Sequence, residues 1–523
     1  MVADIVGNRT LKSMWNETVT YYKSNLFLKY ISVDDHVSCY TYAEFDRLVK
    51  QAANLFLDIG IGKGTFVALH LHNKPEYLIC WLALAQVGAV SVPINEHFQL
   101  SESRYILEKC EIDVVITEPR RLDLYLNHFE ELRLKTIILT DGACSDSRVI
   151  PFYSAIEAQP DTLKKETDIT AEDTAVILFT SGTTKNPKGA IYTHCNVVYG
   201  AVFHAAQIGM TTKDAFLTAM PCYHMDFQEM AASPVICSGS TLIMVEHYSA
   251  RRFWRQVCEH KATLTDTMSI MNRTMMLQPV QPWEKEHCIR QIYFSMGLST
   301  AEKEAFEERF NVRLLNSYGM TETVTSVTLV PLYGEQNWPS VGRPALSYNF
   351  KIIDGQGNTL PPNTEGEICI QGIPGRTLVK GYYKDEEATR RLLDEDGWLH
   401  SGDWGYLDKD GWLFFLGRCG HLIKRSGENI SCAEVECTLT SHPSVADAAV
   451  VGIPDPIRDQ AVKAFVQLTE SARLSAEELI AYCEEHLSRF KVPTIVEFVD
   501  SFPRTATGKI KKNLLLKQNS TDS

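Results

Sequence analysis

Short apolar runs alternate with amphipathic segments over much of the chain. Between residues 65 and 140 the runs FVALHL, AVSVPI, DVVITE and KTIILT are separated by helix-like stretches such as PEYLICWLALAQVG and LSESRYILEKC. The alternation returns after residue 190, with NVVYGAVFHAAQIG, STLIMVE, SARRFWRQVCEHKA and RQIYFSM. Apolar strands that alternate with helices predict parallel sheets covered by helices.

The pattern changes toward the C-terminus. Residues 341–417 hold short strand-like runs separated by turns, which predicts a mostly antiparallel, β-rich part. After Gly417 helix and strand patterns alternate again, over a length that suits a small separate domain. We therefore predict an α/β fold with a large N-terminal domain (1–417) of parallel-rich sheets, a hinge (418–421) and a small mobile C-terminal α/β domain (422–523).

Composition narrows the function without identifying it. The 523 residues are 45% hydrophobic and 22% charged, as in ordinary globular proteins. A net charge of −14 disfavours a general nucleic-acid binder. The longest apolar run, 78–94, is interrupted by Gln86, Gly88 and Pro93, whereas a membrane span needs roughly 20 apolar residues. Since the N-terminus also lacks a signal-peptide pattern, we expect a cytoplasmic protein.

Cysteine and histidine spacing gives little sign of a metal. The fourteen cysteines form no C-x-x-C pair and the chain has no H-E-x-x-H, which favours reduced thiols over a disulfide framework or a zinc site. His70 and His72 lie two apart in an apparent strand and would face the same side, so metal binding there stays open.

The stretch LFTSGTTKNPKG, residues 178–189, has the composition of a phosphate cradle. Glycines permit tight turns, hydroxyls donate hydrogen bonds, and lysines bring positive charge. The order differs from that of a P-loop, because Pro187 stands where the second glycine belongs and Lys188 precedes Gly189. A flexible surface turn is the alternative for this loop taken alone.

Four further segments carry chemistry when taken with this loop. They are NSYGMTET (316–323), SGDWGY (401–406), GRCGHLIKRSGENISCAEVE (417–436) and FPRTATGKIKK (502–512). Alone, each could be a turn, a hairpin acid, a domain-edge salt bridge or a basic tail. Together and in this order they resemble the adenylate-forming superfamily of acyl-CoA synthetases, luciferases and peptide-synthetase adenylation domains, from the Thr41 region to Lys512.

The resemblance implies an enzyme that activates a carboxylic acid with ATP. Attack of the carboxylate on the α-phosphate gives an acyl-adenylate, in which AMP is a good leaving group. In this family Lys188 and its loop would stabilise the departing pyrophosphate, Thr321 would donate to the α-phosphate, and Glu322 would hold Mg²⁺. Tyr318 would lie against the adenine and Asp403 would accept from the ribose hydroxyls. The implied cofactor-binding residues are Thr180, Ser181, Gly182, Thr183, Thr184, Tyr318, Asp403, Arg418, Lys424 and Gly427.

The same resemblance implies a second half-reaction. Lys509 would neutralise charge during adenylation. The small domain would then rotate about Gly420, withdraw this lysine and present the Lys424–Glu428 face to a thiol. Three features depart from the family: Gly420 at the hinge, Cys432 where proline is usual, and the segment Ser295-Met296-Gly297-Leu298 in place of G-G-A-P. Ser295 and Gly297 would therefore shape a different acyl-pocket wall.

The segment MPCYHMDFQ bears on the acid and the acceptor. His224 stands where amino-acid-activating relatives commonly have an aspartate, and no carrier domain follows residue 523, which favours a free-standing ligase that uses CoA. The whole-length pattern resembles the crotonobetaine/carnitine–CoA ligases, whose substrates carry a trimethylammonium group. Such a cation is held by aromatic faces and a carboxylate. The candidate substrate-binding residues are Tyr223, Asp226, Phe227 and Phe203.

Three other functions remain open from the sequence. A short- or medium-chain acyl-CoA synthetase for neutral acids would share every nucleotide motif and differ only in pocket polarity. A nucleotide-binding regulatory protein without turnover would be expected to lose Glu322 or Lys509, and both are present. An oxygen-using luciferase is disfavoured, because the motifs for adenylation say nothing of oxidation.

Overall fold

The computed structural model describes residues 4–180, 187–295, 298, 300–418, 422–470, 472–503, 510, 512 and 515. At positions 417, 418, 422, 429, 431, 433 and 437 only the backbone is described. The chain packs as two compact units. The first comprises Met1–Glu96, Ser103–Phe179 and Gly189–Gly417, and the second comprises His97–Glu102, Thr180–Lys188 and Arg418–Ser523.

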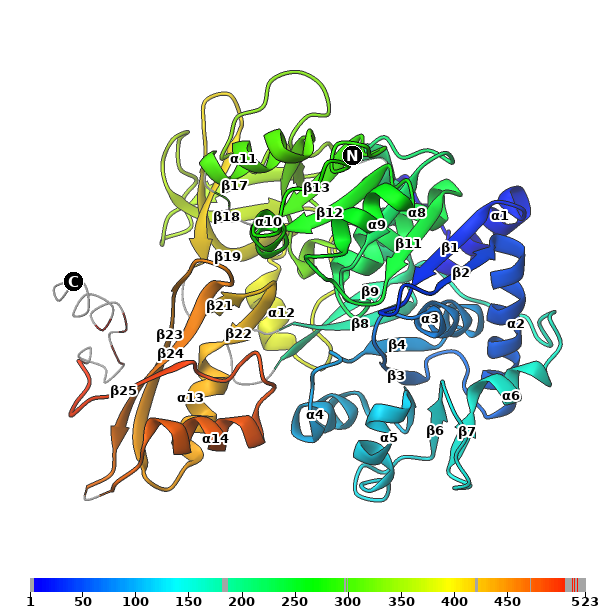
Figure 1. Ribbon diagram of the computed structural model, residues 1–523, viewed down its shortest axis with the longest axis horizontal. Helices are drawn as coiled ribbons and strands as arrows, with labels where there is room; N and C mark the ends of the chain where they lie inside the picture. The colour runs from blue at the N-terminus through cyan, green and yellow to red at the C-terminus, as the bar shows by residue number, and fades with distance from the viewer. Residues whose placement is uncertain are drawn as a thin grey trace. The chain divides into compact units, whose positions relative to one another are not determined.

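One sheet of the chain follows the alternation that the sequence shows between residues 65 and 140. Its seven strands run in the order β7-β6-β5-β3-β4-β8-β9, and the strand pairs from β7 to β8 are parallel. The strands are β3 (Phe66–His70), β4 (Val90–Pro93), β5 (Val114–Thr117), β6 (Thr136–Leu139), β7 (Val149–Pro151), β8 (Thr174–Thr180) and β9 (Lys188–Thr193). The helices between them, seen in Figure 1, are α3 (Pro75–Val87), α4 (Leu100–Cys110), α5 (Pro119–Leu126) and α6 (Phe152–Glu157).

A larger sheet has the order β16-β15-β14-β13-β12-β10-β11-β1-β2. Its centre, from β1 to β14, is parallel, whereas β2, β15 and β16 pair antiparallel at the edges. The strands are β1 (Leu26–Ile31), β2 (Val37–Thr41), β10 (Ala215–Thr218), β11 (Thr241–Val245), β12 (Leu264–Met268), β13 (Gln291–Ser295), β14 (Leu314–Tyr318), β15 (Thr328–Leu329) and β16 (Arg343–Pro344). The associated helices are α1 (Leu11–Tyr22), α2 (Tyr42–Asp58), α7 (His194–Gln207), η1 (Asp226–Ala232), α8 (Ser233–Ser238), α9 (Phe253–Glu259), α10 (Ser269–Met276), α11 (Thr300–Phe310) and η2 (Thr321–Thr323).

Helix α3 shows how this unit is filled. All thirteen of its residues are buried, so it is apolar on every side, as a helix inside a protein must be. Tyr77 on α3 meets the ring of Phe227, which precedes α8 in the chain, at a centroid distance of 6.2 Å. One continuous hydrophobic core therefore joins elements of both sheets.

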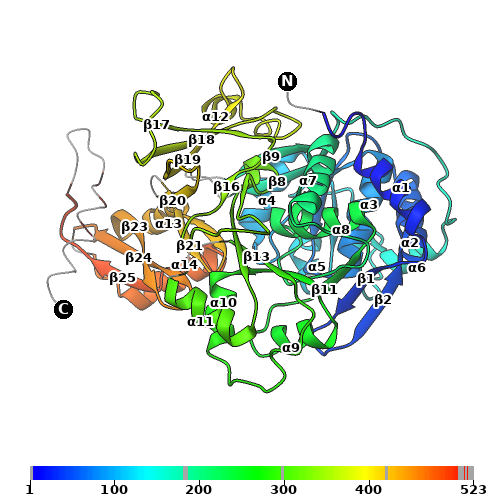
Figure 2. The same ribbon diagram turned by 90° about the horizontal axis from the view of Figure 1, so that it is seen from above.

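The β-rich part is a four-stranded sheet of order β17-β18-β19-β20 (Figure 2). Its strands are β17 (Asn349–Ile353), β18 (Gly366–Gln371), β19 (Trp398–Leu407) and β20 (Leu413–Arg418), with α12 (Glu386–Leu392) before β19. The β17–β18 and β18–β19 pairs are antiparallel, which confirms the change of texture predicted from the sequence.

The second unit has its own sheet, of order β22-β21-β24-β23, with β25 beside β24. Its elements are β21 (Leu422–Arg425), β22 (Glu428–Ser431), α13 (Cys432–Ser441), β23 (Val445–Asp455), β24 (Asp459–Leu468), α14 (Ala476–His486) and β25 (Ile495–Phe498). Ser426 and Gly427 both have positive φ, 54° and 87°, as a two-residue hairpin turn requires. Together the two units confirm the predicted fold class, parallel-rich α/β with a small C-terminal α/β part.

None of the helices in the described part of the chain is long and apolar enough to cross a membrane.

Candidate active site

Two predicted nucleotide residues that lie far apart in the chain meet directly. Tyr318 ends β14 and Asp403 lies on β19, and the Tyr318 hydroxyl donates to Asp403 Oδ2 over 2.7 Å. Both side chains are buried, at 7% and 6% exposed. The Tyr318 ring also packs on Phe415, with 5.8 Å between centroids. The contact joins the nine-stranded sheet to the four-stranded sheet, and no sequence spacing predicts it.

A bulge in β19 sets the position of Asp403. The register with β18 shifts between Glu367 and Cys369, and Gly402 takes φ +67°, a conformation that glycine adopts without strain. The Gly402 amide donates to Glu367 Oε1 (3.0 Å), and the Asp403 amide donates to Ser401 Oγ (3.0 Å). The backbone around Asp403 is therefore fixed by hydrogen bonds on both sides of the bulge.

Glu322 is held by a segment that comes sixty residues later. The Tyr382 hydroxyl donates to Glu322 Oε1 over 2.6 Å, and the Val379 amide donates to the Glu322 carbonyl over 3.1 Å. Residues 379–383 pair in turn with β9, because the Ile191 amide donates to the Gly381 carbonyl over 2.9 Å. Since β9 follows the predicted phosphate loop, this pairing ties Glu322 to the strand that leaves the loop. We call Tyr318, Glu322, Tyr382 and Asp403 the carboxylate corner.

Thr321 and the residues after Glu322 are also tightly constrained. The Tyr192 hydroxyl donates to the Thr321 carbonyl. Val324 has φ +69° and ψ −44°, and the Thr325 amide closes a γ-turn by donating to the Thr323 carbonyl over 2.7 Å. A positive φ in a β-branched residue costs about 1–3 kcal/mol and persists only where the surroundings enforce it.

Residues 223–232, which we call the π-helix segment, hold the predicted acyl-pocket residues. Asp226 begins η1, a π-helix of a kind often found at functional sites. The rings of Tyr223 and His224 lie 4.6 Å apart. Burial raises the pKa of the Asp226 carboxyl, and the nearby His224 opposes this effect. Phe227 packs against Tyr77 in the core.

Phe203, the remaining aromatic candidate, belongs to a different group of rings. It stacks on Tyr199 with 5.1 Å between centroids and meets the edge of Tyr348 at 5.8 Å. Its helix, α7, approaches the π-helix segment closely at Gly200, where a Cβ would lie 2.9 Å from Glu229 Oε2 and 3.4 Å from Val324 Cγ1. Phe203 therefore lies on a helix next to the π-helix segment, but its ring already packs against Tyr199 and Tyr348.

Two buried acids in this region were missed by the sequence prediction. Asp266 on β12 is 3% exposed, its Oδ2 accepts from Thr218 Oγ1 over 3.0 Å, and burial raises its pKa to about 8. Glu229 is fully buried, and burial raises its pKa well above the usual range. The sequence signal for both is an acid that stands among apolar residues: Asp266 in LTDTM and Glu229 in DFQEMAA.

Other predicted residues lie at strand ends and in a hairpin. Thr180 ends β8, and its Oγ1 lies 3.5 Å from the Lys188 carbonyl at the start of β9. Ser295 ends β13 beside Met268. In the second unit, Lys424 and Gly427 belong to the β21–β22 hairpin, where the Lys424 amide donates to Gln460 Oε1 over 2.8 Å.

Several predicted positions lie outside the described residues. They are Ser181, Gly182, Thr183, Thr184, Gly297, Lys509 and, within the hinge, Gly420. Arg418 lies in β20, but its side chain is not described. Their roles stay predictions.

His70 and His72 have different partners. His70 Nδ1 lies 2.6 Å from the Tyr125 hydroxyl. His72 lies against Glu118 through one ring nitrogen and 3.3 Å from Glu246 Oε1 through the other. The two imidazoles thus contact different side chains.

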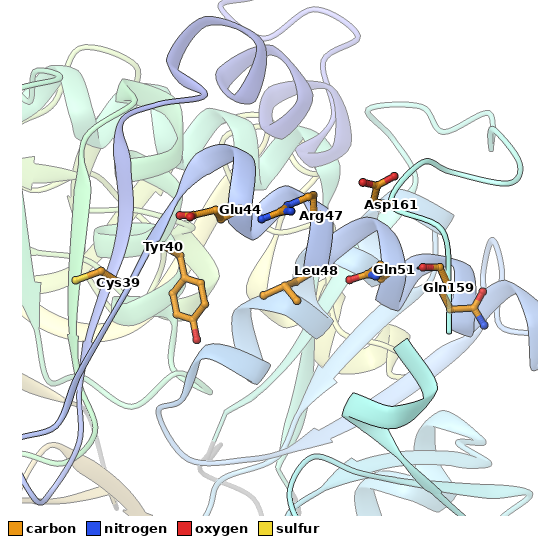
Figure 3. A pocket seen from close by; sticks show the side chains of 8 residues that line it. All are labelled: Cys39, Tyr40, Glu44, Arg47, Leu48, Gln51, Gln159 and Asp161. Carbon is orange, nitrogen blue, oxygen red and sulfur yellow. Dashed lines mark hydrogen bonds between the residues drawn. The ribbon is translucent and has the colours of Figure 1, made fainter. Parts of the chain in front are cut away.

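A polar hollow of about 650 Å³ lies away from the residues discussed so far. Figure 3 shows its lining, which comes from β2, α2 and the turn after α6. The lining residues are Cys39, Tyr40, Glu44, Arg47, Leu48, Gln51, Gln159 and Asp161. It shares no residue with the predicted site, so the mechanism does not use it.

The fold defines a parallel-rich α/β protein with buried carboxylates, and comparison with known proteins identifies its class. The chain belongs to the AMP-binding enzyme family, whose sequence profile matches residues 19–383, and the profile of the AMP-binding enzyme C-terminal domain matches residues 434–509. This confirms the resemblance to the adenylate-forming superfamily.

Particular relatives cover the chain from end to end. It is 43% identical over 516 residues to the crotonobetaine/carnitine–CoA ligase of Proteus mirabilis and 42% identical over 515 residues to that of Citrobacter koseri, each match covering 98% of this chain and 100% of the relative. Among solved structures, a double mutant of o-succinylbenzoate CoA synthetase from Bacillus subtilis is similar, with a TM-score of 0.85 at 26% identity over 98% of this chain and 99% of that one.

Proposed function

We propose that this protein is an ATP-dependent acid–CoA ligase that acts on a trimethylammonium betaine such as crotonobetaine, carnitine or γ-butyrobetaine. The observation that carries the proposal is the full-length similarity to crotonobetaine/carnitine–CoA ligases. In this reaction the acid attacks the α-phosphate of ATP, pyrophosphate leaves, and CoA thiolate then displaces AMP from the acyl-adenylate.

The carboxylate corner supports the nucleotide part of the proposal. Asp403 can accept hydrogen bonds from the ribose hydroxyls, while Tyr318 offers its ring to the adenine and fixes the carboxylate with its hydroxyl. Thr321 is proposed to donate to the α-phosphate. The residues present also fit Mg²⁺, because Glu322 is a buried carboxylate oriented through one oxygen by Tyr382. Bound Mg²⁺ would neutralise phosphate charge, and Glu322 would hold the ion in place.

We assign the neutralisation of phosphate charge to Lys188, to the loop of residues 178–189 that contains it, and to Lys509. Residues Thr180–Thr184 and Lys188 are proposed to stabilise pyrophosphate as it departs, and Lys509 to neutralise charge between the carboxylate and the α-phosphate. We further propose that domains 1–417 and 422–523 change their relative orientation at the 418–421 hinge between the two half-reactions. The Lys424–Gly427 hairpin, with Arg418, would then serve the nucleotide and the thiol.

The π-helix segment supports a cationic substrate. A trimethylammonium group donates no hydrogen bonds, so aromatic faces and carboxylates must recognise it. Asp266 is buried and Asp226 is half-buried, and both carboxyl groups have raised pKa values; a nearby cation would favour their ionised forms. We assign Asp226 the main role, with Tyr223 and Phe227 as aromatic neighbours, Phe203 at the periphery, and Ser295 and Gly297 in the pocket wall. His224 would lie between the acyl pocket and the thiol.

The decisive experiment measures AMP formation by the purified protein with Mg²⁺-ATP and CoA. Crotonobetaine, L-carnitine and γ-butyrobetaine are compared with crotonate and butyrate at equal concentration. Preference for the betaines supports the full proposal. Preference for the neutral acids retains the ligase and removes the betaine assignment, whereas AMP formation with none of them, together with retained ATP binding, would favour a regulatory nucleotide-binding protein.

A further inference from the structure

Three potential metal ligands lie together on the β-rich sheet, where the predicted reaction uses none of them. Glu367 and Cys369 are two apart on β18 and therefore project from the same face. His400 on β19 is the direct cross-strand partner of Cys369. One ligand atom from each residue lies within 4.8 Å of the others.

The distances match those around a zinc ion. Cys369 Sγ lies 3.6 Å from His400 Nδ1, and His400 Nδ1 lies 3.8 Å from Glu367 Oε2. Zinc binds sulfur at about 2.3 Å and nitrogen or oxygen at about 2.0–2.2 Å. At tetrahedral angles these bond lengths separate sulfur from nitrogen by about 3.6 Å and nitrogen from oxygen by about 3.4 Å. Movement of a few tenths of an ångström would thus complete the geometry.

The surroundings also suit a metal. His400 Nε2 lies 3.7 Å from Asp394 Oδ2, and a metal-bound histidine commonly donates its second N–H to such a carboxylate. The His400 and Glu367 side chains are 31% and 26% exposed, so an ion can reach the site. Lys351 on β17 is the cross-strand neighbour of Cys369, and its positive charge opposes the binding of a cation. Its ammonium group is held 4.1 Å from the centre of the Trp398 ring.

We propose that Glu367, Cys369 and His400 bind one zinc ion, with Asp394 orienting the histidine and a water in the fourth position. The Cys369 thiol loses its proton to solvent as the zinc–sulfur bond forms, and no electrons are transferred. The motif C-x-x-C is not needed, because the ligands come from adjacent strands in register. The set therefore escaped a prediction based on local spacing.

Zinc at this site would act on the bulge that carries Asp403. Glu367 holds the Gly402 amide through Oε1, which leaves Oε2, the oxygen nearest His400, for the ion. An occupied site would fix Glu367 and with it the backbone next to Asp403. We expect zinc to stabilise this part of the fold; an accompanying effect on nucleotide affinity rests on the proposed role of Asp403.

The test starts from the full chain stripped of metal with a chelator. Zinc is titrated in competition with a chromophoric chelator, and cobalt(II) is added separately to look for a sulfur-to-cobalt charge-transfer band. We expect one sub-micromolar site per chain, release of a proton on binding, and X-ray absorption showing one sulfur at about 2.3 Å with nitrogen or oxygen neighbours at about 2.0 Å.

Variants separate this site from the other cysteines. Cys369→Ser, Glu367→Gln and His400→Gln should each weaken zinc binding by at least about 100-fold, and Asp394→Asn by about 10- to 100-fold. Cys195→Ser, at another buried free cysteine, is the matched control and should bind zinc normally. Glu367 is partly exposed, so its variant should fold even if Cys369→Ser does not. Absence of tight zinc, or equal binding by wild type and Glu367→Gln, would overturn the proposal, whatever the ligase assay shows.

Discussion

The carboxylate corner is buried and the π-helix segment is mostly buried, but acidic groups have different surroundings in the two regions. In the corner, Asp403 and Glu322 each receive a short hydrogen bond from a tyrosine. In the neighbourhood of the π-helix segment, Asp266 Oδ1 has no hydrogen-bond partner among the described residues, and burial raises the pKa of Glu229 despite its contact with Ser233. Buried polar atoms without partners are costly.

The contrast separates carboxylates that tyrosine hydroxyls already hold from acids that are buried with few polar partners. A carboxylate already fixed by hydrogen bonds can meet a neutral donor or a metal with little reorganisation. A buried acid without a partner is destabilising alone and is best satisfied by a cation. Under the proposed function, the protein itself fixes the carboxylates assigned to the nucleotide, and a cationic substrate would stabilise the ionised form of the acids near the π-helix segment.

The largest effect should come from breaking the corner. Glu322→Gln removes the charge but keeps the shape and the acceptor for Tyr382, so kcat for AMP formation should fall by at least about 100-fold. Glu387→Gln, on the exposed start of α12, is the matched control and should leave kcat unchanged. Retention of wild-type kcat in Glu322→Gln would remove this residue from the chemistry.

The next effect should appear only with charged acids. Asp226→Ala should raise KM for betaines by about 10-fold or more, equivalent to about 1.4 kcal/mol, and leave KM for butyrate nearly unchanged. Steady-state kinetics with both acids gives the ratio within one protein preparation. An equal change for both acids would show that Asp226 has only a structural role.

Tyr318→Phe tests whether the tyrosine hydroxyl orients Asp403. Its loss leaves a buried carboxylate short of one donor, so KM for ATP should rise by about 5- to 10-fold. A double-mutant cycle with Asp403→Asn should show a coupling of about 1 kcal/mol or more. Tyr406→Phe, on the same strand as Asp403, serves as the control. Additive effects would mean that the hydrogen bond has no functional role.

The last effect concerns the dependence of stability on pH and leaves the catalytic rate aside. The pKa of Asp266 is raised to about 8 in the folded protein, so the fold binds a proton that the unfolded chain releases above about pH 4. Wild-type stability should therefore fall as pH rises toward 8. Asp266→Asn cannot ionise at this position. The unfolding free energy of the variant minus that of the wild type should therefore increase as pH rises toward 8, by up to about 1.4 kcal/mol per pH unit.

Denaturant unfolding at pH 6, 7 and 8 measures this difference, with the exposed Asp34→Asn as control. A constant difference across these pH values would contradict the buried, protonated state of Asp266. Saturating crotonobetaine should reduce the advantage of the variant if the ligand cation satisfies the ionised carboxylate.

Sequence patterns predicted what depends on neighbours in the chain. The runs FVALHL and AVSVPI became β3 and β4, and PEYLICWLALAQVG became α3, because apolar period and helix length are local properties. The segment SARRFWRQVCEHKA gave a shorter helix, α9 (Phe253–Glu259). The tyrosine that binds Asp403 lies 85 residues before it, so motif recognition found both residues but not their contact.

Features that depend on register could not be predicted. The Cys369–His400 pair exists because β18 and β19 align with a bulge between them, and a shift of one residue would place these side chains on opposite faces. The burial of Asp266 and Glu229 likewise depends on packing between distant elements. A single sequence records neither the register nor the depth of a side chain.

The complete burial of α3 has a consequence for how this protein is made. Its thirteen residues contact elements on both sides of the core, including the ring and amide of Phe227 and Gln228 through Tyr77. A nascent chain that ends before the nine-stranded sheet has emerged would expose this apolar helix, which invites aggregation. The two sheets of the first unit should therefore fold cooperatively, and fragments cut between β9 and β10 should require co-expression to remain in solution.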